Sequence, residues 1–153
     1  MALRTIVQEG DEVLRKKTFA VEVFDAKLHQ LLDDMKDTVQ HAEGAGLAAP
    51  QIGILRKIAV IQVEEGYFEL INPKIVEAVG EQVGPEGCLS VQGKYGIVAR
   101  PKSVKVEYQD RYGNAKQLTA VDFFARAVCH ELDHLDGILY IDKAKELRAE
   151  RKE

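Results

Sequence analysis

The chain of 153 residues contains no tryptophan, only two cysteines and no long apolar run. Two cysteines are too few to staple a domain of this size with disulfides, and a reducing cytoplasm would keep both as thiols. Residues 1–17 alternate apolar and charged positions and lack the apolar stretch that a secretion signal or a membrane span requires. We therefore expect a cytoplasmic protein that does not enter a membrane.

The sequence also lacks any block of positive charge. Lys and Arg number 21 against 25 Asp and Glu, which gives a formal net charge of -4. Without a basic run to follow the phosphates, direct binding of nucleic acid is not expected. Hydrophobic residues make up 46% of the chain, so we expect one compact core and a single domain over residues 1–153.

Hydrophobic periodicity predicts two helices separated by strands. From Asp25 to Val39 apolar residues recur at helical spacing, and Gly44 is placed to end this helix in a left-handed cap. A second helix is predicted from Asp122, closed by Gly137. We expect an α+β fold in which antiparallel sheets pack around the C-terminal helix. The strands are predicted from β-branched and aromatic runs at 57–63, 67–72, 74–83, 103–109 and 115–120.

The second helix carries the pattern HELDH at residues 130–134. Residues four apart share one helical face, so His130 and His134 can aim both imidazoles at one divalent metal, with Glu131 beside them. A single histidine in a helix is more often an ordinary solvated or hydrogen-bonded residue. The complete H-E-x-x-H pattern reverses that preference and favours a metal site.

A catalytic metal needs a third protein ligand. Cys129 adjoins His130 and points about 100° away from it, which makes it a poor ligand for the same ion. Glu146 and Glu150 are alternatives, but they lie in a charge-dense tail that we expect to be a solvated helix or a frayed end.

Cys88 is the better candidate for the third ligand. It lies in the segment PEGCLS at 85–90, which is predicted to connect two strands. Gly87 would let the backbone turn sharply there and present the thiol. The alternative is that Cys88 is a small buried hydrophobic residue.

A third motif, GAGLAAPQIG, occupies residues 44–53. Its small residues let the backbone approach another group closely, and Gln51 adds an amide that can donate or accept a hydrogen bond. The motif follows a helix and lacks the third glycine of a dinucleotide-binding fingerprint, so we discard that function. Taken alone, Gln51 is more often a satisfied structural amide than a catalytic group.

Together, GAGLAAPQ, EGCLS and HELDH, in this order and at these separations, resemble the three signature motifs of the peptide deformylase family. The resemblance covers nearly the whole chain. It departs at Gln92 and Ala99, where family members often carry proline. The resemblance implies a hydrolase that removes the formyl group from the N-terminal formyl-methionine of new polypeptides and releases formate. Its substrates would be nascent chains, which implies proximity to the ribosome.

The resemblance also implies roles for individual residues. Cys88, His130 and His134 would bind the metal with water in the fourth position; the ion is usually Fe(II), and Zn, Ni or Co suit the same ligands. Glu131 would act as general base and then general acid. The Gln51 side chain and the Leu89 backbone N–H would stabilise the negative charge of the tetrahedral intermediate.

Further positions are implied around the substrate. Glu86 would fix a ligand imidazole. The cleft would be bordered by the backbone of Gly44, Ala45, Gly46 and Leu47 and by the segment near Gly87. The methionine side chain would lie near Ala45, Val128 and Cys129.

Two other functions remain open from the sequence. One is a generic H-E-x-x-H peptidase with Glu146 or Glu150 as third ligand, which predicts that Cys88→Ser still binds metal. The other is a non-catalytic module in which the metal only joins sheet to helix, which predicts that Glu131→Gln affects nothing beyond stability.

Overall fold

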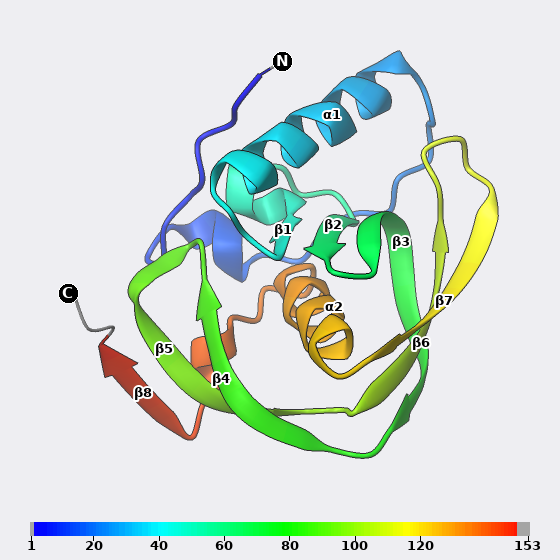
Figure 1. Cartoon of the computed structure of the whole chain (residues 1–153). Helices are drawn as coiled ribbons and strands as arrows, with labels where there is room; N and C mark the ends of the chain where they lie inside the picture. The colour runs from blue at the N-terminus through cyan, green and yellow to red at the C-terminus, as the bar shows by residue number, and fades with distance from the viewer. Residues whose placement is uncertain (1, 150–153) are drawn as a thin grey trace.

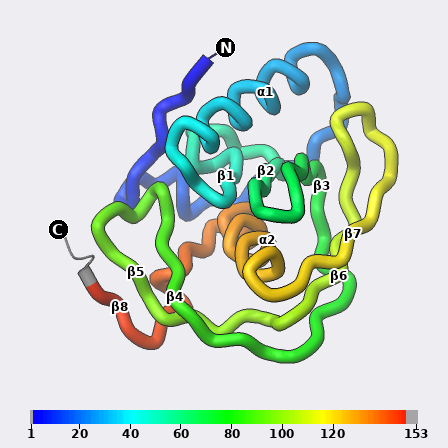
Figure 2. Tube along the Cα trace, viewed as in Figure 1, coloured from blue at the N-terminus to red at the C-terminus, as the bar shows by residue number. Residues whose placement is uncertain are grey.

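The computed structural model describes residues 2–149, which form two helices and two antiparallel sheets (Figures 1 and 2). The helices are α1 (Ala26–His41) and α2 (Phe123–His134). The first sheet has the order β1-β2-β3-β6-β7 and the second β4-β5-β8. The strands are β1 (Gly46–Ala48), β2 (Ile58–Val63), β3 (Gly66–Val79), β4 (Gln82–Cys88), β5 (Val91–Arg100), β6 (Ser103–Gln109), β7 (Ala115–Val121) and β8 (Glu146–Ala149).

Helix α2 lies at the centre of the molecule, with the two sheets curving around it (Figure 1). Its apolar side chains, Phe124 and Val128 among them, pack with Leu70, Val104 and Val106 of the five-stranded sheet. Burial of each such side chain stabilises the folded state by roughly 1.5–3 kcal/mol relative to leaving it exposed to water. The expected α+β architecture, with antiparallel sheets around the C-terminal helix, is therefore confirmed.

Helix α1 covers the end of the five-stranded sheet that carries β1 and β2. The Asp25 side chain caps it by accepting a hydrogen bond from the backbone N–H of Leu28 (3.1 Å). The expectation of a left-handed cap at Gly44 is wrong, because the left-handed residue is Glu43, at φ 56°. Gly44 lies close to Leu89 instead: a Cβ there would lie 2.7 Å from Cδ1 of Leu89, so the Leu89 side chain would have to shift.

The segment predicted to connect two strands at 85–90 is largely strand. β4 continues to Cys88, and its pairing with β5 shifts register between Glu86 and Cys88. Gly87 is not among the glycines with positive φ, so the sharp turn expected there is wrong. The irregular pairing at the end of β4, together with the turn at Leu89 and Ser90, sets the position of the thiol.

The charge-dense tail is also extended where the structure describes it. Residues 146–149 form β8, which pairs antiparallel with β5, for example Glu146 with Ile97. The solvated helix expected there is wrong, because an open strand edge offers backbone hydrogen bonds that outweigh helical propensity. Neither helix within residues 2–149 is long and apolar enough to cross a membrane.

Candidate active site

A thiol and two imidazoles converge where β4 ends against α2. The candidate ligand atoms of Cys88, His130 and His134 all lie within 4.8 Å of one another. Cys88 Sγ is 3.4 Å from His134 Nε2, and the backbone N–H of Ser90 donates to the same sulfur at 3.4 Å. One thiolate with two imidazoles is a donor set suited to several divalent transition metals.

The electrostatics of the two histidines also fit a cation. Burial lowers the pKa of His134 to about 3, so its imidazole is neutral, which is the form that ligates metals. Burial acts in the same direction on His130, but the Glu131 carboxylate and the Cys88 thiol outweigh it and raise the pKa of His130 to about 10. His130 is therefore protonated in the metal-free protein at neutral pH, and metal binding through its imidazole would release that proton.

Glu86 holds His130 in place from the side away from Cys88. Its Oε1 is 2.8 Å from His130 Nδ1, which leaves Nε2 for the ligand cluster. Both carboxylate oxygens also accept hydrogen bonds from Arg100, and Oε2 accepts another from Arg126 Nη1 at 2.7 Å. Burial opposes ionisation of Glu86, but the bonds from Arg100 and His130 prevail and lower its pKa to about 2.

Sequence reasoning missed both arginines. Arg126 had a usable signal, because it precedes His130 by four residues and so shares its helical face. Arg100 had none, since its contact with Glu86 depends on the pairing of β4 with β5.

We expect Glu86→Gln to destabilise the metal-free protein by about 3–5 kcal/mol at pH 7, since it leaves the buried Arg126 without a carboxylate and Arg100 with Asp133 as its only one. The pKa of Glu86 lies below its ordinary value of 4.5, so the carboxylate stabilises the fold above pH 4.5 and this contribution is lost as the pH falls toward 2. Urea unfolding between pH 7 and pH 2.5 measures the difference. The difference in the free energy of unfolding between wild type and Glu86→Gln should shrink on acidification. The control Glu81→Gln, at an exposed position, should unfold with the same free energy as wild type at every pH. A pH-independent difference would contradict the assigned ionisation.

Glu131 is buried beside the ligand cluster. Its side chain borders two cavities, yet Oε1 has no hydrogen-bond partner among residues 2–149. Burial raises the pKa of this carboxyl group to about 7. Gly46 is required opposite it, because a Cβ at that position would lie 2.7 Å from both Cγ and Oε2 of Glu131.

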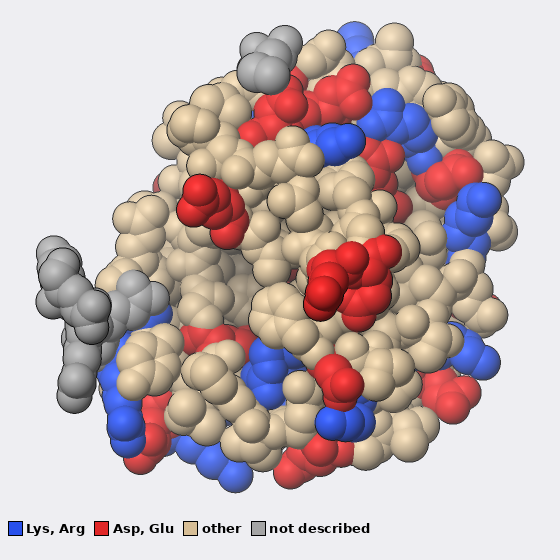
Figure 3. Space-filling model, in the orientation of Figure 1, with Lys and Arg blue, Asp and Glu red and all other residues tan. Residues whose placement is uncertain are grey.

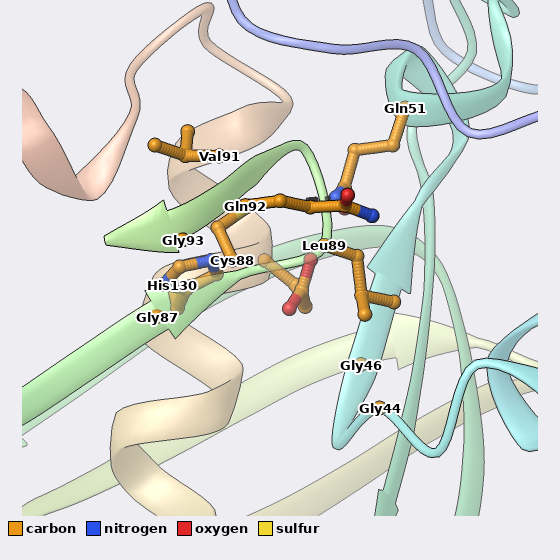
Figure 4. Close-up of a pocket in the computed structure, with 11 residues that line it drawn as sticks. Gly44, Gly46, Gln51, Gly87, Cys88, Leu89, Val91, Gln92, Gly93 and His130 are labelled. Atoms are coloured by element: carbon orange, nitrogen blue, oxygen red, sulfur yellow. Dashed lines mark hydrogen bonds between the residues drawn. The ribbon is translucent and has the colours of Figure 1, made fainter. Parts of the chain in front are cut away.

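Gln51 is fixed by its own neighbours with its NH₂ group toward the site. The Ala48 backbone N–H donates to Oε1 at 2.9 Å. Nε2 in turn donates to Ser90 Oγ at 3.1 Å and approaches Cys88 Sγ at 3.6 Å. In Figure 4 its side chain extends from the wall opposite His130 toward Cys88 and Leu89.

The larger cavity has a volume of about 690 Å³ and runs past these groups. Gly44 and Gly46 lie on one wall, and Cys88 and His130 on the other (Figure 4). Among residues 2–149, Glu131 is the only charged residue in its lining apart from histidine. On the molecular face in Figure 3, side chains of both charges are interspersed, and the hollow is bordered mainly by uncharged side chains. Its complete lining is Gly44, Gly46, Gln51, Gly87, Cys88, Leu89, Val91, Gln92, Gly93, His130 and Glu131.

A second cavity of about 140 Å³ also borders His130 and Glu131, and its lining includes Ala45. The expectation that Val128 and Cys129 border the substrate is wrong, because both are buried in the core between α2 and the five-stranded sheet. Residues adjacent to a histidine face away from it, whereas those three and four positions earlier share its face. The cavity is lined accordingly by Phe123, Arg126 and Ala127, together with Pro85, Glu86 and Gly87.

Two other predicted positions lie outside the site. Leu47, whose backbone was expected to border the cleft, lines neither cavity, and its side chain is buried in the core beside α1. Glu146 is exposed on β8 and is not part of the ligand cluster. Glu150 lies outside the described residues.

Comparison with known proteins agrees with this geometry. Residues 3–150 match the family model for polypeptide deformylase. A peptide deformylase of Caldicellulosiruptor bescii is 57% identical over 143 residues, covering 94% of this chain and 86% of that protein. The crystal structure of peptide deformylase from Thermotoga maritima has a TM-score of 0.93 at 37% identity, covering 95% of this chain and 100% of that one. A peptide deformylase structure from Legionella pneumophila has a TM-score of 0.91 at 41% identity, covering 94% and 87%. The chain therefore belongs to the polypeptide deformylase family, metal-dependent hydrolases that remove the formyl group from the N-terminal methionine of new polypeptides.

Proposed function

We propose that Cys88, His130 and His134 hold one divalent ion, Fe(II) in the native protein, and that the groups around them hydrolyse the formyl amide. The observation that carries this proposal is the convergence of a thiol and two imidazoles within 4.8 Å, directly beside a buried carboxylate. Zn, Ni and Co suit the same donors and would substitute for iron. When bound, the ion acts as a Lewis acid and lowers the pKa of a coordinated water from 15.7 to roughly 7.

Glu131 is the proton carrier in this proposal. It accepts a proton from the attacking water as the water oxygen bonds to the formyl carbon. It then delivers a proton to the amine nitrogen as the carbon–nitrogen bond breaks, which leaves formate and a free amino terminus. Support comes from Oε1, a buried acceptor without a partner among residues 2–149 at the edge of both cavities.

Gln51 and Leu89 stabilise the charge that develops on the formyl oxygen. The Ala48 N–H holds the Gln51 carbonyl, so the amide can present only its NH₂ group to the site. Leu89 directly follows Cys88 and lines the same cavity, so its N–H is a second donor beside the sulfur. The loss of one such donor costs about 2.7–4 kcal/mol in other enzymes.

The formylated residue occupies the smaller cavity with its side chain, against Ala45, Phe123 and Ala127. The peptide beyond it follows the larger cavity, whose glycine-rich, mostly uncharged lining offers little to distinguish one side chain from another. Peptides should therefore be recognised mainly through their backbone. Because the substrates are nascent chains, the enzyme acts near the ribosome in the cytoplasm.

Metal removal and replacement test the proposed centre. Protein stripped by a chelator under anaerobic conditions should release no formate from a short formyl-methionyl peptide. Added Fe(II) should restore release in proportion to bound iron, up to one ion per chain. The unformylated peptide, supplied in parallel, should remain intact. Iron-loaded protein that cleaved this control but released no formate would support the generic peptidase instead.

A further inference from the structure

The smaller cavity contains a charge that an apolar methionine pocket does not need. Arg126 lines it and is only 6% exposed. Its position four residues before His130 puts the guanidinium on the face of α2 that meets the substrate. The lining also includes the apolar residues Ala45, Phe123 and Ala127, together with the ionisable residues Glu86, His130 and Glu131.

The hydrogen bonds of Arg126 use only one of its three nitrogens. Nη1 donates to Glu86 Oε2 at 2.7 Å, to the Val98 carbonyl at 3.1 Å and to the Gly84 carbonyl at 3.3 Å. Within residues 2–149, no acceptor is bonded to Nε or Nη2, and neither is a fully buried atom. These two nitrogens carry three N–H groups. A nearly buried guanidinium thus retains donors for a ligand.

Glycine at position 84 keeps this edge of the guanidinium open. A Cβ there would lie 3.3 Å from Nη2, 3.7 Å from Cζ and 4.0 Å from Nε. Any larger side chain would cover the same donors from the β4 side. Arg126 lines the smaller cavity, and Gly84, which is not part of that lining, leaves this edge of its guanidinium uncovered.

We infer that this edge binds an acceptor oxygen on the substrate side chain, so that the enzyme also deformylates peptides beginning with formyl-methionine sulfoxide. The inference rests on the proposed function, which places this side chain in the smaller cavity. A thioether sulfur is a weak acceptor, whereas a sulfoxide oxygen is polar and loses free energy in a purely apolar pocket. A charged donor in the pocket compensates that loss.

The reaction on this substrate is the same hydrolysis. Water adds to the formyl carbon, the carbon–nitrogen bond breaks, and the proton goes to the amine. The sulfur–oxygen bond takes no part, so no reductant is required.

The test compares three formyl tripeptides that differ only in their first side chain: methionine, norleucine and methionine sulfoxide. The two sulfoxide epimers are assayed separately because the sulfur is chiral. Formate release gives kcat/KM for iron-loaded wild type and for Arg126→Lys, which keeps a cation for Glu86 but has no planar fork of donors. We expect the sulfoxide-to-norleucine ratio of kcat/KM to fall by about 10- to 100-fold in the variant, as for a lost hydrogen bond to a charged group.

Arg111→Lys is the matched control. Arg111 binds both carboxylate oxygens of Glu69, at 2.9 and 2.7 Å, outside the two cavities. Its variant should keep the wild-type ratio. An unchanged ratio in Arg126→Lys, including an equal loss on all peptides, would overturn the inference. So would a wild-type enzyme that turns over both sulfoxide epimers more than 100-fold less efficiently than norleucine, roughly the discrimination of an apolar pocket. No formate from any peptide would instead mean that the proposed function has failed.

Discussion

Glu131→Gln is expected to lower the rate of formate release by about 10²–10⁴-fold, the range typical of a lost general acid–base group. Glutamine has nearly the same shape but cannot accept and return the proton. The variant should still bind one metal ion per chain, because Glu131 is not among the three clustered ligand residues. Anaerobic formate assays paired with metal analysis measure both properties.

The stability of this variant provides a separate check. In the metal-free protein the pKa of Glu131 is raised to about 7 from an ordinary 4.5. Its carboxyl group therefore favours the folded state fully below pH 4.5, and this contribution is lost as the pH rises through 7. Wild type should lose stability relative to Glu131→Gln between pH 5 and pH 8 in urea unfolding. The exposed Glu64→Gln serves as control. Full activity of Glu131→Gln would exclude Glu131 as the proton carrier.

Cys88→Ser is expected to abolish both metal retention and formate release. A serine hydroxyl is a far poorer ligand than a thiolate, and even the loss of a partner outside the ligand set costs 10–100-fold in metal affinity. Metal content after desalting, measured on anaerobically loaded protein, should fall from about one ion per chain to a small fraction.

The other cysteine gives the matched control. Cys129 is 6% exposed, packs in the core against the five-stranded sheet and is not part of the ligand cluster, so Cys129→Ala should retain its metal and most of its activity. If Cys88→Ser kept one ion per chain and full activity, a third ligand such as Glu146 or Glu150 would have to be sought.

The helices and the ligand spacing could be predicted because they depend on local pattern. Capping by Asp25 and the four-residue spacing of His130 and His134 are properties of a single helix. The structure of the charged tail could not be predicted, since β8 forms only because β5 offers a free edge. The left-handed conformation was predicted at Gly44 but occurs at Glu43. The position of Gly44 could not be predicted from local pattern, because Gly44 packs closely against Leu89, a residue 45 positions later in the chain.

The candidate site was predicted unevenly for the same physical reason. The structure brings Cys88, His130 and His134 together as the sequence suggested. Most of the residues that line the smaller cavity were not predicted. The family resemblance implied Val128 and Cys129 near the methionine side chain, whereas helical geometry places Arg126 and Ala127 on the face of His130. The ion pair of Arg100 with Glu86 joins neighbouring strands and had no signal in either segment.

The central position of α2 has a consequence for how the chain folds as it is made. Apolar residues of β2, β3, β6 and β7 pack on α2 and precede it in the chain, so the face of the sheet that α2 covers stays open until residues 123–134 have left the ribosome. Long-range β pairing is slow, and uncovered strands are prone to aggregate while they wait. The face of the sheet that α2 covers should therefore be among the last parts to fold. The metal site assembles at the same late stage, because it needs α2 against the end of β4.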